Sequence, residues 1–283
     1  MKLLRYGPAG EERPALLGAQ GEIRDLSGIV PDITGGTLQP ESFARLRQID
    51  QTTLPVVAGS PRIGPCVARV GKFICIGLNY SDHAAESRMP LPTEPIIFMK
   101  STSCIVGADD DIELPRGSTK TDWEVELGVV IGSRAKYVDE RDAMAHVAGF
   151  CIVNDVSERA FQLEGTGQWV KGKSADTFGP IGPWLVTPDE VPDPQGLDLW
   201  LEVDGRRYQN GNTRTMVFGV AFLVSYLSRF MSLHPGDVIA TGTPPGVGLG
   251  QHPPVYLQPG NRVRLGIAGL GVQHQRVVAS PAG

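Results

Sequence analysis

The apolar segments of this chain are short, and turns that contain glycine or proline separate them. The 283 residues include 35 glycines and 23 prolines, which is many for a helical protein. Segments such as 73–78 and 150–153 are rich in isoleucine, valine and phenylalanine, as is typical of strands. We therefore expect a β-rich, mixed α+β fold with many turns.

The chain is long enough for a small domain and a larger one. We expect a small β-containing N-terminal domain at 1–68 and the main domain at 69–283. Strands are predicted at 2–6, 14–17, 23–26, 73–78, 96–99 and 150–153. Helices are predicted at 41–48, from Asp139 through Val147 to Gly149, and from Phe218 onward. The last helix has helical spacing of apolar residues, which predicts core positions at Val220, Leu223, Val224, Leu227 and Met231.

Composition excludes several classes of protein. The net charge of −5 provides no basic surface for nucleic acid. The sequence has neither a signal-peptide pattern nor an apolar run long enough to cross a membrane, so we expect a cytoplasmic protein. The four cysteines, Cys66, Cys75, Cys104 and Cys151, lack metal-ligand spacing and are predicted to be buried free thiols.

The segment 122–130, Asp-Trp-Glu-Val-Glu-Leu-Gly-Val-Val, is predicted to be a strand that carries two acids on one face, Glu124 and Glu126. Neighbouring carboxylates repel unless a cation lies between them or one is protonated. Asp155 ends the next apolar run. Three oxygen ligands without cysteine or histidine suit Mg²⁺, Mn²⁺ or Ca²⁺ rather than zinc. The Glu-x-Glu pair alone favours the alternative of a solvent-facing polar side of an antiparallel strand.

The segment 77–86 follows a predicted strand and contains His83 and Glu86. On one helical turn these residues lie on the same face and can form a hydrogen bond. A carboxylate in that position fixes the imidazole tautomer and raises its basicity, as for a general base. Taken alone, the pair is more often an exposed surface pair.

Further candidates follow Asp155. Arg159 and Gln162 would lie above a metal if a helical turn follows the strand. Lys173, in a loop flanked by glycine, is a candidate to meet a substrate carboxylate or a developing oxyanion. For Lys171 and Lys173, each taken separately, simple solvation is the more common explanation.

The segment 241–248, Thr-Gly-Thr-Pro-Pro-Gly-Val-Gly, follows a predicted strand. Its glycines allow backbone amides and threonine hydroxyls to approach an anionic group closely. A plain β-turn is the alternative. The remaining histidines are interpreted as structural or solvated: His146, His234, His252 and His274.

Together these segments resemble the fumarylacetoacetate hydrolase family. The Gly-x-Asn-Tyr-x-x-His-x-x-Glu segment at 77–86, the Glu-x-Glu strand, Asp155 and the 241–248 loop occur in the order of that family. The likeness extends from about Lys72 to the C-terminus. Each motif alone is weak, but four in order are specific.

The resemblance implies a β-sandwich or roll around the site, in a homodimer. It implies Mg²⁺ or Mn²⁺ bound by Glu124, Glu126 and Asp155, with Ca²⁺ as a substitute in a crystal. It also implies that His83 and Glu86 activate water on a lid and that Lys173 is catalytic. Substrate contacts are assigned by the resemblance to Arg159, Gln162, Tyr80, Thr241, Gly242 and Thr243.

The implied substrate is a small anionic keto acid. A 2,4-diketo acid would bind the metal through its carboxylate and 2-oxo oxygens, and hydrolysis of its C3–C4 bond would release pyruvate. Residues 172–180 and the N-terminal unit look most like bacterial hydrolases of 2,4-diketo-3-deoxy sugar acids, in particular 2,4-diketo-3-deoxy-L-rhamnonate. The alternatives are an acylpyruvate or fumarylpyruvate hydrolase, an oxaloacetate decarboxylase, a ureidoglycolate lyase and a metal-binding relative without activity.

Overall fold

The structure, a computed structural model, describes residues 1–82 and 91–280. Its largest element is a ten-stranded sheet in the order β3-β2-β1-β12-β10-β9-β15-β4-β5, with β6 paired to β12. Its strands are β1 (Lys2–Tyr6), β2 (Arg13–Leu17), β3 (Ile23–Asp25), β4 (Phe73–Gly77), β5 (Ile96–Lys100), β6 (Ile105–Val106), β9 (Val125–Ile131), β10 (Val147–Asn154), β12 (Gly179–Val186) and β15 (Val238–Ala240).

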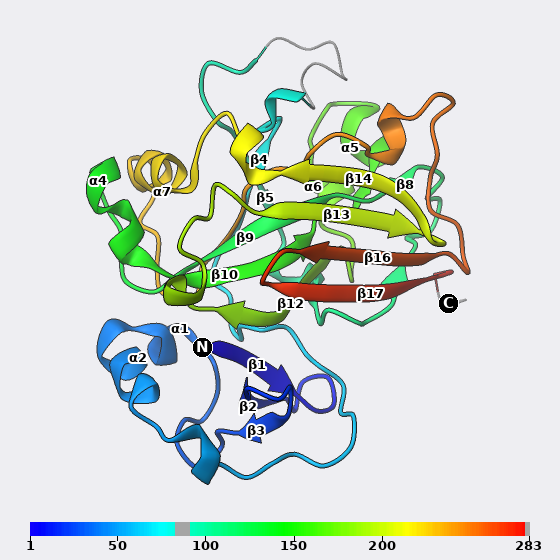
Figure 1. Ribbon diagram of the computed structural model, residues 1–283. Helices are drawn as coiled ribbons and strands as arrows, with labels where there is room; N and C mark the ends of the chain where they lie inside the picture. Colours follow the sequence, from blue (N-terminus) through cyan, green and yellow to red (C-terminus); the bar gives the residue numbers. More distant parts are fainter. Residues whose placement is uncertain (83–90, 281–283) are drawn as a thin grey trace.

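A five-stranded sheet in the order β14-β13-β16-β17-β7 packs on the large one, and Figure 1 shows it in front of β9 and β10. Its strands are β7 (Ile112–Glu113), β13 (Asp198–Val203), β14 (Arg206–Asn212), β16 (Arg262–Ile267) and β17 (Gly271–Val278). Two short strands, β8 (Thr121–Asp122) and β11 (Ser157–Glu158), form a separate pair.

The helices are short. They are α1 (Gly35–Leu38), α2 (Pro40–Arg47), α4 (Glu140–Ala143), α5 (Arg159–Leu163), α6 (Val170–Lys173) and α7 (Val220–Ser228). The 3-10 turns are η1 (Gln51–Thr53), η2 (Thr102–Cys104), η3 (Met144–His146), η4 (Pro188–Glu190), η5 (Thr213–Thr215) and η6 (Gly248–Gly250). Within the described ranges no helix is long and apolar enough to cross a membrane.

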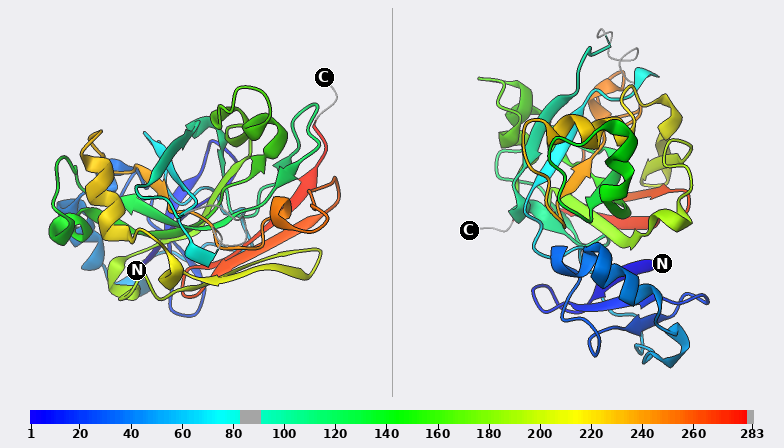
Figure 2. Two further views of the ribbon diagram at one scale, coloured as in Figure 1. Left: turned by 90° about the horizontal axis from the view of Figure 1, so that it is seen from above. Right: turned by 90° about the vertical axis from the view of Figure 1, so that its left-hand side faces the viewer.

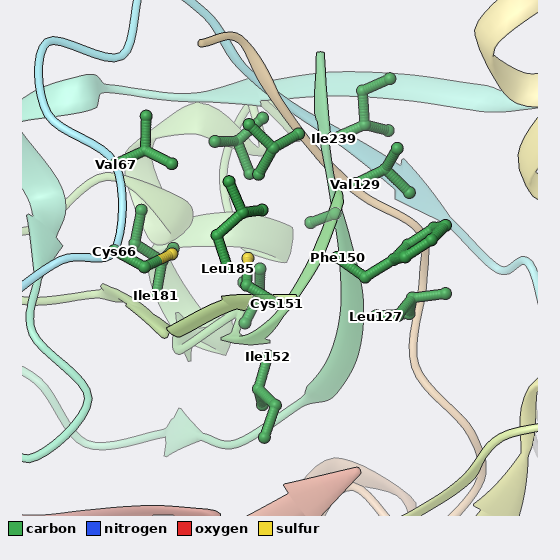
Figure 3. Packing of buried hydrophobic residues seen from close by; sticks show 14 of the residues in the cluster. Cys66, Val67, Leu127, Val129, Phe150, Cys151, Ile152, Ile181, Leu185 and Ile239 are labelled. Atoms are coloured by element: carbon green, nitrogen blue, oxygen red, sulfur yellow. The ribbon is translucent and has the colours of Figure 1, made fainter. Parts of the chain in front are cut away.

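The core is one buried cluster that joins the large sheet to β13 and β16 and also includes residues of α1, α2 and α7. Every residue of β9 and β10 is buried, because elements cover both faces of these central strands. In β13 and β17, by contrast, buried positions alternate with more exposed ones, as expected when one face of a strand meets solvent. Figure 3 shows Cys66 and Cys151 among the packed side chains of this core. All four cysteines are free and buried, which confirms the prediction.

The N-terminal elements form one end of the molecule (Figures 1 and 2). Strand β1 pairs with β12, with Lys2 opposite Val186 and Leu3 opposite Leu185. The three N-terminal strands therefore extend the large sheet. The division into domains at residue 68 stays a prediction.

The strands predicted at 2–6, 14–17, 23–26, 73–78, 96–99 and 150–153 are confirmed, and α2 and α7 lie where helices were expected. The strand predicted at 122–130 is interrupted, because β8 ends at Asp122 and β9 begins at Val125, so that Trp123 and Glu124 lie between two strands. The helix predicted to continue through Val147 to Gly149 is wrong at its end. Helical structure stops at His146, and the next residues begin β10. Pairing of this segment with β9 outweighs its local helical pattern, because tertiary packing overrides weak helix propensity.

Candidate active site

Strands β9 and β10 bring three carboxylates together. Their pairing places Glu126 opposite Val153, and the amide of Asp155 donates to the carbonyl of Glu124 at 2.9 Å. Oxygen atoms of Glu124, Glu126 and Asp155 all lie within 4.8 Å of one another. All three residues are buried: Glu124 is 7% exposed, Glu126 1% and Asp155 0%. The alternative of a solvent-facing polar strand is therefore wrong, because this end of the sheet is covered.

Two lysines neutralise part of this charge. Lys173 Nζ donates to Glu124 Oε2 at 2.9 Å and to Asp155 Oδ2 at 2.7 Å. Lys100 Nζ donates to Asp155 Oδ1 at 2.6 Å. Both lysines are almost fully buried, at 1% and 2% exposure. Simple solvation of Lys173 is thus excluded, and this residue lies in helix α6 rather than in the expected loop.

Glycine at position 172 permits this placement of Lys173. A Cβ atom at Gly172 would lie 2.4 Å from the carbonyl oxygen of Glu158 and 2.6 Å from Cβ of Gln162. Only a residue without a side chain allows α6 to approach α5 and β11 so closely. The Gly-Lys pair in the sequence therefore has a local structural cause.

Arg159 connects the carboxylates to a fourth acid. Its guanidinium donates to Glu124 Oε1 at 2.6 Å, to Asp122 Oδ2 at 2.9 Å and to Gln162 Oε1 at 3.0 Å. Arg159 and Gln162 occupy one turn of α5, as predicted from their spacing. Asp122 also accepts from the amides of Gly248 and Leu249 at 2.6 and 2.9 Å. The ion pairs thereby fix the position of segment 248–249.

Glu126 differs from its neighbours. It forms no ion pair with any described residue, and its Oε2 accepts from the amide of Gly242 at 2.8 Å. Burial, together with the negative charges of Asp155 and Glu124, raises the pKa of Glu126 well above its usual range. Burial opposes ionisation of Glu124 too, but Lys173 and Arg159 hold the pKa of that carboxyl well below its usual range.

The charges fit a divalent cation. We define the site cluster as four acids and three bases: Asp122, Glu124, Glu126, Asp155, Lys100, Arg159 and Lys173. With all groups ionised its net charge is −1. A divalent ion would change this to +1, and a monoanionic substrate would then bring it to zero. Since the ligands are hard carboxylate oxygens, the cluster suits an ion such as Mg²⁺ or Mn²⁺.

The cluster opens into a cavity of about 620 Å³. Its polar end is lined by Glu124, Glu126, Arg159, Gln162, Lys173 and Thr243. Most of the other side chains that line it are apolar, and we call six of them the apolar wall: Leu78, Phe98, Leu163, Trp169, Val247 and Leu249. His252, expected to be structural or solvated, is exposed and also lines the cavity.

The threonine loop is held on β9. The hydroxyls of Thr241 and Thr243 each donate at 2.9 Å, to the carbonyls of Leu127 and Val125. Gly242 has φ +99, and a Cβ atom there would lie 2.8 Å from Cβ of Asn79, so glycine is required for this conformation. The loop thus positions Glu126 through the Gly242 amide. Its contact with substrate stays a prediction.

The remaining predicted residues lie after β4. Tyr80 is fully buried, and its hydroxyl has no hydrogen-bond partner among residues 1–82 and 91–280. Burial, with the charges of Glu126 and Asp82, raises the pKa of Tyr80 well above its usual range. Contact of Tyr80 with substrate stays a prediction. His83 and Glu86 lie outside the described residues.

The sequence did not predict Lys100, Asp122 or the apolar wall as parts of the site. One signal was available for Lys100, because a lysine ends the apolar strand 96–99 just as Asp155 ends the run 150–153. The wall residues come from separate segments, and no spacing connects them.

Comparison with known proteins extends the similarity over the whole chain. A family model described as "Fumarylacetoacetate (FAA) hydrolase C-terminal" matches residues 72–278. A Burkholderia cenocepacia protein named "Putative hydrolase" is 68% identical over 277 residues, 98% of each chain. A solved fumarylacetoacetate hydrolase of Exiguobacterium antarcticum is 34% identical, with a TM-score of 0.87 over 99% of each chain. The maleylpyruvate hydrolase of Sphingobium sp. SYK-6, solved with manganese(II) and pyruvate, is 26% identical, with a TM-score of 0.82 over 99% of this chain and 100% of that one. The expected β-rich mixed fold is confirmed by these structures.

Proposed function

Since the chain belongs to the fumarylacetoacetate hydrolase family, we propose that it is a divalent-metal-dependent hydrolase that cleaves a carbon–carbon bond of a 2,4-diketo acid. The family match and the names of its relatives support hydrolase activity. The observation that carries the proposal is the group of three buried carboxylates at the polar end of a cavity of about 620 Å³. A relative that was solved with manganese(II) and pyruvate also supports it.

In this proposal Glu124, Glu126 and Asp155 would hold Mg²⁺ or Mn²⁺, which supplies Lewis-acid polarisation of the substrate's 2-oxo group. Lys173 and Arg159 line the cavity beside these carboxylates. Their positive charges orient the substrate carboxylate and offset the negative charge that develops during C3–C4 cleavage. Gln162, fixed by Arg159 at 3.0 Å, contacts the bound acid.

Water activation is assigned to His83, with Glu86 holding its imidazole, as the family resemblance implies. His83 removes a proton from the water that attacks the distal carbonyl. The C3–C4 electron pair then leaves with the pyruvate portion, and the distal portion leaves as a second acid. We also propose that the protein acts as a cytoplasmic homodimer.

The candidate substrates differ in the group on the distal carbonyl. It carries a hydroxyl in 2,4-diketo-3-deoxy-L-rhamnonate, the sugar acid suggested by the sequence, and it is apolar or unsaturated in acylpyruvates and fumarylpyruvate. Oxaloacetate decarboxylation involves no attack by water and would therefore not require His83. Ureidoglycolate cleavage, or metal binding without catalysis, would release no pyruvate from any of these acids.

The test is release of pyruvate, coupled to lactate dehydrogenase, from a panel of 2,4-diketo acids and oxaloacetate with Mg²⁺, Mn²⁺ or EDTA. We expect metal-dependent pyruvate from at least one diketo acid, with Glu124→Gln inactive. Glu202→Gln, on the other sheet, is the matched control and should keep wild-type activity. Pyruvate from oxaloacetate alone, or from none of the acids, would refute the hydrolase proposal.

A second variant tests the assignment of the base. His83→Ala should abolish hydrolysis of the diketo acid while Mg²⁺ affinity, measured by calorimetry, stays close to that of the wild type. If this variant still hydrolyses the diketo acid, His83 is not the general base.

A further inference from the structure

We propose that the apolar wall selects 2,4-diketo acids with an apolar acyl tail, alkyl or aryl, and disfavours those with a hydroxylated tail. This inference rests on the proposed function, because the polar end of the cavity is taken to hold the keto-acid portion. It distinguishes among the candidate substrates and disfavours the sugar acid.

The apolar wall begins directly beside the catalytic charges. The ring centroid of Phe98 lies 5.0 Å from Lys173 Nζ. It lies 5.2 Å from the ring centroid of Trp169, in an edge-to-face contact. Both rings line the cavity. A substrate whose keto-acid end approaches Lys173 would therefore place its distal group against aromatic surface.

The position of Trp169 depends on a glycine. A Cβ atom at Gly77 would lie 2.8 Å from the Trp169 ring, so a side chain at position 77 would displace the indole. Gly77 is the last residue of β4. Glycine at the end of β4 therefore leaves room for the indole of Trp169.

A second part of the wall, at Val247 and Leu249, is held in place by the site cluster. Asp122 accepts from the amide of Leu249 at 2.9 Å and so holds the Val247–Leu249 segment beside the carboxylates. Leu249 and Leu163 are 38% and 46% exposed. Large apolar side chains that remain exposed around a cavity are typical of a surface that a ligand covers.

Two polar groups of the lining, the Thr243 hydroxyl and the carbonyl oxygen of the Gln162 side chain, are already engaged. The hydroxyl of Thr243 donates to Val125 and accepts from Gln209 at 2.8 Å, and Gln162 Oε1 accepts from Arg159. The side chains of Leu78, Phe98, Leu163, Val247 and Leu249 have no polar atoms. A substrate hydroxyl that is buried against them would lose its hydrogen bonds to water without replacement. Such a loss lowers kcat/KM by roughly 10-fold or more. Each methylene that is covered raises kcat/KM about 4-fold.

One matched pair of substrates tests the choice directly. 2,4-Dioxohexanoate and its 5-hydroxy derivative, the rhamnose-derived acid, differ only in a hydroxyl. We expect kcat/KM for pyruvate release to be at least 10-fold higher for 2,4-dioxohexanoate, and to rise further for 2,4-dioxoheptanoate and 2,4-dioxooctanoate. Equal values, or preference for the hydroxylated acid, would overturn the inference while leaving the proposed hydrolase intact.

A double variant locates the selectivity in the wall. Leu163→Asn with Leu249→Asn changes two partly exposed residues, so the fold should persist. The increase in kcat/KM from 2,4-dioxopentanoate to 2,4-dioxooctanoate should shrink about 10-fold, with little change for the shortest acid. Ile29→Asn, at a position 47% exposed in the N-terminal elements, is the control. If the double variant shows the same dependence of kcat/KM on chain length as the wild type, Leu163 and Leu249 do not contact the substrate tail.

Binding without turnover separates the two proposals. Calorimetry in Mn²⁺ with pyruvate, 2-oxohexanoate and 2-oxooctanoate should give affinities that increase with chain length in the wild type, and less steeply in the double variant. If no diketo acid yields pyruvate but affinity still increases with chain length, the proposed reaction is refuted, and the inference that the apolar wall binds an apolar tail is supported. If the affinities do not depend on chain length, that inference is refuted whatever the reaction is.

Discussion

Two clusters of acids and bases in this protein have the same formal net charge and different electrostatics. The N-terminal cluster consists of three acids and two bases: Glu12, Asp32, Asp110, Arg5 and Arg62. Its net charge is −1, as in the site cluster. Every carboxylate of the N-terminal cluster contacts an arginine, at distances from 2.5 to 3.3 Å. In the site cluster Glu126 forms no ion pair with a described residue.

Access to solvent separates the clusters further. The side chains of Asp32, Arg62 and Asp110 are 21–27% exposed, so water screens their charges, whereas Arg5 and Glu12 are as buried as Arg159 and Glu124. In the site cluster Lys100, Asp155 and Lys173 are nearly inaccessible. A buried carboxyl without a cation must take up a proton or bind an ion. What distinguishes the site cluster is therefore one carboxylate that has no cationic partner among the described residues and that lines a cavity, and not its net charge.

The largest expected effect comes from Lys100→Met. Asp155 would keep only Lys173, and loss of one partner from a buried ion pair leaves charge uncompensated, which costs about 3 kcal/mol of unfolding free energy. Urea unfolding in EDTA measures this loss. Mn²⁺ should restore part of the stability, because the ion supplies positive charge to Asp155. A loss below about 1 kcal/mol would mean that Lys173 alone compensates Asp155.

The next effect concerns Glu126→Gln. Saturating Mn²⁺ should stabilise the wild type by about 2.7 kcal/mol at 100 times its Kd, and the variant should lose this stabilisation. In EDTA the variant should be at least as stable as the wild type, because the amide removes a buried acid that has no cationic partner. Thermal unfolding with and without Mn²⁺ measures both. Equal stabilisation of the two proteins by Mn²⁺ would remove Glu126 from the ligand set.

The dependence of stability on pH provides a smaller effect with a definite sign. In the metal-free protein the pKa of Glu126 is raised, so above pH 4.3 the folded state keeps a proton that the unfolded state has released. The unfolding free energy should therefore fall as pH rises from 5 to 7, by at most about 1.4 kcal/mol per unit. The pKa of Glu124 is lowered, so this residue makes the unfolding free energy depend on pH only below pH 5.

Subtraction of the Glu126→Gln curve isolates this contribution. Urea unfolding in EDTA at pH 5, 6 and 7 should give a downward slope for wild type minus variant. A flat difference would show that Glu126 is ionised in the folded, metal-free protein, and the contrast between the two clusters would then lose its electrostatic basis.

The sequence predicted the acids of the site but not their counter-charges. Glu124 directly precedes β9, Glu126 lies within it, and Asp155 follows another apolar run, so the spacing along the sequence was sufficient. Lys100 lies 55 residues before Asp155, and their contact depends on how β5 lies relative to β10. No local pattern encodes such a contact, and for the same reason the burial of Lys173 was not predicted.

The fold shows the same limit. Strands such as β4 and β10 were predictable from β-branched and aromatic runs, whereas the helix expected at 139–149 ends early because β9 pairs with Val147. The apolar wall was not predictable, because Phe98 and Trp169 are 71 residues apart and meet only after β5 and α6 pack together. The ion pairs of the N-terminal cluster likewise join residues that are 7 to 50 apart.

The smallest effect is expected for Arg62→Met in the N-terminal cluster. Glu12 would keep its contact with Arg5 at 3.3 Å, and Asp110 would still accept from the Gly107 amide at 2.7 Å. Because Arg62 is partly exposed, we expect a loss of about 1 kcal/mol in urea and the same stabilisation by Mn²⁺ as in the wild type. A loss as large as that of Lys100→Met would show that burial does not separate the clusters. Partial recovery of that loss in Mn²⁺ would show that the N-terminal cluster also responds to the ion.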